Sequence, residues 1–158
     1  MKLESRNNQI AQEVIEIVEK YNFQREKLLQ ILEELNDSYG YLSEFVMKEV
    51  AKNLQLTTTE VYSVATFYSF LNTRPKGKYI IRLCKTISCV LAGKNAVANA
   101  LRNELGIDFG ETTSDGKFSL EFTNCIGMCN QGPAMLINND VYYHLDPEKA
   151  VEIVEKYQ

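Results

Sequence analysis

The sequence predicts an α+β protein in which a small helical bundle precedes a domain of mixed helices and strands. Up to residue 74, apolar residues recur at the three- and four-residue spacing of amphipathic helices, whereas short β-rich runs and helical segments alternate after residue 78. Between these parts, the segment 73–78 combines Pro75 and Gly77, which end a helix and favour a turn. We therefore predict two domains, residues 1–74 and 75–158.

Four helices are expected in the first domain. The first helix carries one apolar stripe, and a second, leucine-rich helix follows and ends in the segment Asn36 to Gly40. Ser43 is the expected N-cap of a third helix, and Thr57 with Glu60 forms a capping box that opens the fourth. Short links predict an antiparallel bundle. The residues of the first stripe are Ile10, Val14, Ile17, Val18 and Tyr21.

Four aromatic residues follow the capping box, and we interpret them as core residues of the bundle. The alternative is a surface that docks a partner or the second domain. We predict residues 1–74 to be a docking domain. These aromatic residues are Tyr62, Phe67, Tyr68 and Phe70.

The second domain is predicted to follow the order β-α-β-β-β-α, which is compatible with a thioredoxin-like topology. Strands are expected at Tyr79 to Leu83 and Phe118 to Phe122, separated by a helix from Ala92 to Leu105. A hairpin over 134–144 precedes a last helix, for which Asp146 is the expected N-cap and Pro147 the first residue.

Composition excludes several classes of function. The chain has 158 residues, 45% hydrophobic and 24% charged, and a net charge of −4, which disfavours binding to nucleic acid. No apolar run approaches the ~18–20 residues that span a bilayer, so no membrane insertion is expected. The first residues also lack the apolar segment of a signal peptide, so we expect a cytoplasmic protein.

The candidate site consists of four cysteines in two close pairs. Cys84 and Cys89 form a C-x4-C pair, and Cys125 and Cys129 form a C-x3-C pair. Disulfides are disfavoured in a reducing cytosol, and incidental buried thiols would be scattered along the chain. Structural zinc remains an alternative, although its pairs are usually C-x2-C. Four thiolates also suit an iron–sulfur cluster, but the plant-type and bacterial ferredoxin spacings are absent.

Each cysteine pair is expected in a loop directly after a strand. If the two strands run in the same direction in one sheet, both loops meet at one edge, where α/β sheets usually place their sites. Gly127 and Gly132 would let the loop backbone approach a cluster, and Lys85 would partly offset its negative charge. No G-x-G-x-x-G follows a strand, so this chain has no sign of a dinucleotide site.

Several stretches together resemble the thioredoxin-like [2Fe–2S] subunit of NADH dehydrogenases (the complex I peripheral arm), which also occurs in NAD-linked [FeFe] hydrogenases and formate dehydrogenases. The resemblance spans about Leu28 to Tyr157. Two features are more similar to the subunits of soluble hydrogenase complexes than to those of complex I. They are the short N-terminal part, without a long extension of the organellar type, and the residues of the last cysteine segment. The matching stretches are 39–42 (YGYL), 61–68 (VYSVATFY), 75–78 (PKGK), 110–118 (GETTSDGKF), 125–129 (CIGMC) and 133–135 (PAM), together with the C-x4-C pair.

The resemblance implies that Cys84, Cys89, Cys125 and Cys129 ligate one [2Fe–2S] cluster. It implies an electron-transfer subunit without a catalytic or substrate site of its own. FMN and NAD(H) would be bound only by a partner flavoprotein subunit, and further iron–sulfur subunits would belong to the same complex. The favoured parent is a soluble NAD-linked hydrogenase or formate dehydrogenase, and the alternative is respiratory NADH:quinone oxidoreductase. A free-standing ferredoxin is disfavoured because a mobile carrier needs no docking bundle.

Overall fold

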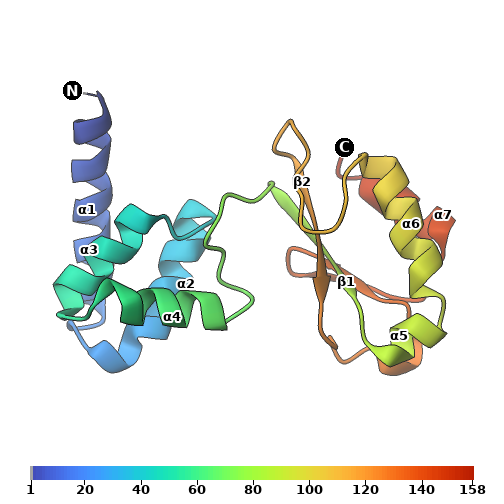
Figure 1. The fold of residues 1–158 in the computed structure, drawn as a ribbon, viewed down its shortest axis with the longest axis horizontal. Helices are drawn as coiled ribbons and strands as arrows, with labels where there is room; N and C mark the ends of the chain where they lie inside the picture. The colour runs from blue at the N-terminus through green and yellow to red at the C-terminus, as the bar shows by residue number, and fades with distance from the viewer. Residues whose placement is uncertain (1) are drawn as a thin grey trace. The chain divides into compact units, whose positions relative to one another are not determined.

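The computed structural model describes residues 2–158, and side-chain surroundings are described from Arg6 onward. The chain separates into two compact units, Met1–Pro75 and Lys76–Gln158. The boundary between them lies one residue later in the chain than the boundary expected from the sequence. Figure 1 shows a helical unit, coloured blue to green, and a second unit that contains the sheet. The α+β fold class predicted from the sequence is confirmed.

The helical unit contains α1 (Lys2–Lys20), α2 (Leu28–Tyr39), α3 (Glu44–Leu54) and α4 (Thr58–Phe67), with a short 3-10 turn, η1 (Arg25–Lys27), before α2. Its core is aliphatic and includes Val14 and Val18 of the predicted stripe, while Ile10, Ile17 and Tyr21 pack at the edge of this core. The helices bury these faces against one another because no single amphipathic helix shields its own apolar stripe.

The predicted helix starts of this unit are confirmed by their hydrogen bonds. Ser43 Oγ accepts the Val46 N–H at 3.2 Å. At α4, Thr57 Oγ1 accepts the Glu60 N–H at 3.2 Å, and the Glu60 carboxylate accepts the Thr57 N–H at 2.7 Å. Both caps satisfy backbone donors that a helix start otherwise leaves unpaired.

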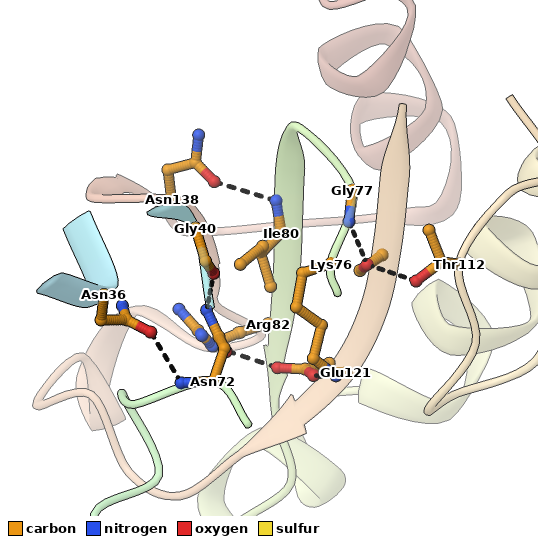
Figure 2. Close-up of polar contacts among 11 residues, drawn as sticks. Asn36, Gly40, Asn72, Lys76, Gly77, Ile80, Arg82, Thr112, Glu121 and Asn138 are labelled. Atoms are coloured by element: carbon orange, nitrogen blue, oxygen red, sulfur yellow. Dashed lines mark hydrogen bonds and ion pairs between the residues drawn. The ribbon is translucent and has the colours of Figure 1, made fainter. Parts of the chain in front are cut away.

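A buried asparagine pair fixes the segment that follows α4. Asn72 donates its backbone N–H to Asn36 Oδ1 at 2.9 Å and its side-chain amide to the Gly40 carbonyl at 3.1 Å (Figure 2). Its own carbonyl accepts the Leu42 N–H at 2.7 Å. The chain therefore leaves the bundle from a position held against the end of α2.

The core interpretation of the aromatic residues was wrong for three of the four. Phe67 is 79% exposed, Tyr62 50% and Phe70 44%, and Tyr68 alone among the four packs against the aliphatic core. The helical pattern at the end of α4 gives few positions that face the core, and small residues such as Ala65 occupy them. The rings are left on the surface.

The second unit is built on a four-stranded sheet with the order β2-β1-β3-β4. β1 (Tyr79–Cys84) pairs in parallel with β2 (Phe118–Thr123) and antiparallel with β3 (Met135–Ile137), which pairs antiparallel with β4 (Asp140–Tyr142). The hairpin is shorter than expected, since β3 begins at Met135 and β4 ends at Tyr142, and the chain turns at Asn138, which adopts a positive φ of 53°.

Three helices complete this unit: α5 (Ile87–Leu91) and α6 (Lys94–Leu105) connect β1 to β2, and α7 (Pro147–Glu155) ends the chain. Figure 1 shows α6 and α7 side by side next to the sheet. The core lies between these helices and the alternating inward residues of the strands, among them Leu83 and Leu120. The Asp146 cap, which accepts the Lys149 N–H at 2.7 Å, and Pro147 at the helix start are confirmed.

Polar contacts hold the start of this unit together. The Gly77 N–H donates to Ser119 Oγ at 2.7 Å, and Ser119 Oγ also lies 2.7 Å from Thr112 Oγ1 (Figure 2). Glu121 on β2 forms ion pairs with Lys76 and with Arg82 on β1. Over the described residues, none of the helices has the length and apolarity needed to span a membrane.

Candidate metal centre

The two cysteine pairs lie at the same edge of the sheet. Cys84 is the last residue of β1 and pairs in register with Thr123, the last residue of β2, two positions before Cys125. The Lys85 N–H donates to the Thr123 carbonyl at 2.9 Å. The parallel arrangement assumed for the two strands is therefore confirmed, and both cysteine-bearing segments begin next to each other.

The structure corrects the expectation that both pairs lie in loops. Cys84 belongs to β1, and Cys89 belongs to the short helix α5, whereas Cys125 lies in a loop and Cys129 begins a single 3-10 turn, η2 (Cys129–Gln131). The predicted helix from Ala92 starts instead at Lys94, because Gly93 with φ +99° separates it from α5. A five-residue helix is too short to show apolar periodicity in a sequence.

The site has a buried half and an exposed half. Cys84 and Cys89 are buried, whereas Cys125 and Cys129 are exposed. The Sγ atoms of Cys125 and Cys129 lie 3.2 Å apart, and all four cysteines are free thiols.

Hydrogen bonds and burial act in opposite directions on the buried pair. Burial raises the pKa of Cys84, but hydrogen bonds with Thr86, whose Oγ1 lies 3.1 Å from Sγ, with Cys89 and with the Ile126 backbone together outweigh it, so the pKa of the thiol lies below its usual value. Burial and the hydrogen bond shared with Cys84 raise the pKa of Cys89. In the exposed pair, the hydrogen bond with Cys125 and its charge raise the pKa of Cys129. Within the buried pair, the thiolate is therefore favoured at Cys84 and disfavoured at Cys89.

Backbone groups approach the sulfur atoms closely. The Gly127 N–H lies 3.4 Å from Cys125 Sγ, and Gly127 adopts a φ of +87°, which a side chain would strain. A Cβ on Gly132 would lie 3.4 Å from Cys89 Sγ. Both glycines that the sequence suggested for close approach are therefore placed beside cysteines.

The donor chemistry of the site fits an iron–sulfur centre. In the described part of the chain, no three His, Cys, Asp or Glu side chains gather closely enough to hold one metal ion. The site instead offers two pairs of thiols, with backbone and hydroxyl donors aimed at sulfur. Four thiolates are the ligand set of a [2Fe–2S] cluster, and N–H donors to sulfur are its usual outer partners.

One charged residue near this edge was missed by the sequence reasoning. Lys85, the expected charge-offsetting residue, is exposed to solvent. Lys94 is 9% exposed, and its Nζ lies 4.8 Å from the centre of the Phe122 ring. In the sequence, Lys94 resembles any polar residue in the first turn of a helix, so no local signal distinguishes it.

The fold and the sheet edge that carries both cysteine pairs are those of a thioredoxin-like domain, and a helical unit precedes it in the chain. The chain belongs to the thioredoxin-like [2Fe-2S] ferredoxin family, whose model matches residues 14–158. The resemblance that the sequence motifs indicated is thereby confirmed.

Curated relatives include subunits of two kinds of oxidoreductase. The chain is 38% identical over 138 residues to the NAD-reducing hydrogenase HoxS subunit alpha of Cupriavidus necator, covering 87% of this chain and 23% of that subunit. It is 37% identical to an NADH-quinone oxidoreductase subunit from Aquifex aeolicus (84% and 83% covered) and 32% identical to the NADP-reducing hydrogenase subunit HndA of Solidesulfovibrio fructosivorans (94% and 86%). The chain thus spans less than a quarter of the first relative and most of the other two.

A similar fold occurs in the crystal structure of an NAD+-reducing [NiFe]-hydrogenase in the air-oxidized state. The match has a TM-score of 0.74 and 29% sequence identity, and it covers 84% of this chain and 23% of the hydrogenase chain. The predicted thioredoxin-like fold class is therefore confirmed by a solved structure as well as by the family.

Proposed function

We propose that this chain is a [2Fe–2S] electron-transfer subunit that exchanges single electrons with a flavoprotein subunit holding FMN and NAD(H). The observation that carries the proposal is the meeting of two thiol pairs at one sheet edge in a member of this ferredoxin family. The parent we propose is an NAD-linked hydrogenase or formate dehydrogenase complex in the cytoplasm. The corresponding part of NADH:quinone oxidoreductase is the second candidate, because relatives of that name match equally well.

Cys84, Cys89, Cys125 and Cys129 would hold the cluster. When bound, the cluster supplies reversible storage of one electron. The protein's own contribution is to orient and shield the site. Burial of the first pair within β1 and α5 excludes water on one side, whereas the exposed second pair leaves a short path for an electron on the other.

Metal and sulfide analysis tests the ligand assignment. Protein purified without oxygen should contain about two irons and two sulfides per chain and become paramagnetic on reduction with dithionite. Cys125→Ser should lose or weaken the centre because one of four thiolates is gone. Full iron content with an unchanged spectrum in this variant would show that the ligand set is wrong. One zinc per chain without a reducible signal would instead favour the alternative function, a zinc-stabilised structural docking module without a redox role.

The partner's contact surface on the second unit is proposed to include the exposed face of α5. Leu91 is 81% exposed and Ile87 is 69% exposed, and their spacing of four residues places them on one side of this helix. The same helix carries the buried Cys89. An apolar surface beside a redox centre suits a partner that must exclude water while its own cofactor approaches.

The exposed aromatic residues of the helical unit are proposed as a second contact surface. Phe67 is the most exposed of them, and no residue of this unit's core covers it. Binding of the co-expressed flavoprotein to Leu91→Ser and Phe67→Ser should be weakened, whereas Val141→Ser, an exposed apolar residue on β4, is the matched control. Equal binding by all three variants would exclude both surfaces. Deletion of residues 1–74 should likewise weaken partner binding more than cluster binding.

A further inference from the structure

The two exposed cysteines lie with their thiols in contact. The Sγ atoms of Cys125 and Cys129 are 3.2 Å apart, and both residues are exposed free thiols. A disulfide has an S–S length of about 2.05 Å, so the two sulfur atoms have to approach each other by only about 1.1 Å to form a bond. Exposed side chains exchange rotamers within nanoseconds, so an approach of this size requires no unfolding of the segment.

The backbone that joins these two residues has room to adjust. Cys125 lies in a loop and Cys129 begins the 3-10 turn η2, so both lie outside the strands of the described sheet. Gly127, midway between them, has nothing within 4 Å of the position that a Cβ would occupy. A bond between the two sulfur atoms would close a ring of five residues, 125–129, without breaking a pairing of the sheet.

The other two cysteines are held in regular structure and are shielded from solvent. Cys84 is 1% exposed and ends β1, where its N–H donates to the Ala134 carbonyl at 3.0 Å. Cys89 is 2% exposed and belongs to α5. Thiol–disulfide exchange requires that a thiolate reaches a sulfur atom of the oxidant, so access decides which thiols react. The fold therefore leaves one pair open to a dissolved oxidant and closes off the other.

We propose that Cys125 and Cys129 form a reversible disulfide before a cluster is loaded, and that this bond controls cluster loading. The oxidant is a small disulfide such as glutathione disulfide. One thiolate of the pair attacks it and releases one glutathione, and the second thiolate then attacks the mixed disulfide and releases the other. Two protein thiols and one small disulfide thus become one protein disulfide and two small thiols, which take up the two protons.

The bond would withdraw two of the four proposed sulfur ligands, because only a thiolate binds metal. The control of loading therefore rests on the function proposed above. An exposed disulfide belongs to the readily reduced kind, and a five-residue ring restricts the unfolded chain only slightly, so a dithiol should reopen it. While closed, it protects both exposed thiols from irreversible oxidation to sulfinic acid.

The test is oxidation of the full chain, freed of iron, with glutathione disulfide, followed by alkylation in denaturant and digestion with trypsin. Both exposed cysteines fall in one tryptic peptide, 118–149, whereas Cys84 and Cys89 fall in 83–85 and 86–94. We expect 118–149 to lose the mass of two hydrogen atoms and the other two peptides to be fully alkylated. An unoxidised peptide, attached glutathione, or a cross-link through Cys84 or Cys89 would overturn the proposal.

Cys129→Ser and Cys89→Ser are matched variants, since each removes one cysteine. Cys129→Ser should keep one glutathione on Cys125, whereas Cys89→Ser should still form the bond. Loading is measured on the wild type: the initial rate of cluster formation from iron and sulfide should fall several-fold after oxidation and recover after treatment with dithiothreitol. Equal rates would refute the control of loading. If neither state binds iron and sulfide, the function proposed above fails, while the peptide masses still decide whether the bond forms.

Discussion

Gly77 is the position at which one added methyl group should do most damage to the second unit. A Cβ built on Gly77 would lie 2.6 Å from the carbonyl carbon of Phe118 and 2.9 Å from its Cα and N. All three atoms belong to the backbone of β2, so no side chain is able to move out of the way. Gly77→Ala therefore has to displace the segment that precedes β1, at the start of the second unit, away from β2.

The magnitude follows from what this displacement breaks. Overpacking against a fixed backbone costs about 1–3 kcal/mol. Moving Gly77 also stretches its 2.7 Å hydrogen bond to the fully buried Ser119, and an unpaired buried donor costs about 1–3 kcal/mol. We expect a loss of about 3 kcal/mol, which lowers the melting temperature of a unit of this size by about 12–24 °C.

Thermal unfolding, followed by circular dichroism of the whole protein, measures this loss. Gly116→Ala is the control: Gly116 lies in the same unit with nothing within 4 Å of an added Cβ, and its φ of +70° carries only the usual cost of about 1–2 kcal/mol for a side chain there. The helical unit has a separate core and should unfold as in the wild type. If Gly77→Ala were no less stable than Gly116→Ala, the steric argument would be refuted.

Three further variants test individual contacts. Ser119→Ala leaves the Gly77 N–H without its acceptor and should cost about 1–3 kcal/mol in chemical denaturation of the second unit. Asp146→Ala removes the α7 cap and should cost about 1 kcal/mol in the same assay. Hydrogen bonds from Thr57 lower the pKa of Glu60. The stability advantage of the wild type over Glu60→Gln should therefore be complete above the ordinary pKa of 4.5 and disappear as the pH falls through the lower folded-state value; a pH-independent difference contradicts this.

Features of the fold that depend on nearby residues were predictable from the sequence. The caps at Ser43, Thr57 and Asp146 were found because a side chain and the backbone donor it accepts are only three residues apart. The meeting of the cysteine pairs was predictable too. It requires only that each pair begins at or just after the end of a strand and that the two strands are parallel.

Features that depend on distant residues were not predictable in this way. Aromatic residues are commonly buried, but Tyr62 and Phe67 lie off the stripe of α4 that carries the buried Val61 and Ala65, so their rings stay exposed. Lys94 is brought against Phe122 from 28 positions away in the chain, so its burial is a property of the crossover rather than of its own segment. The short α5 falls below the length at which periodicity is visible.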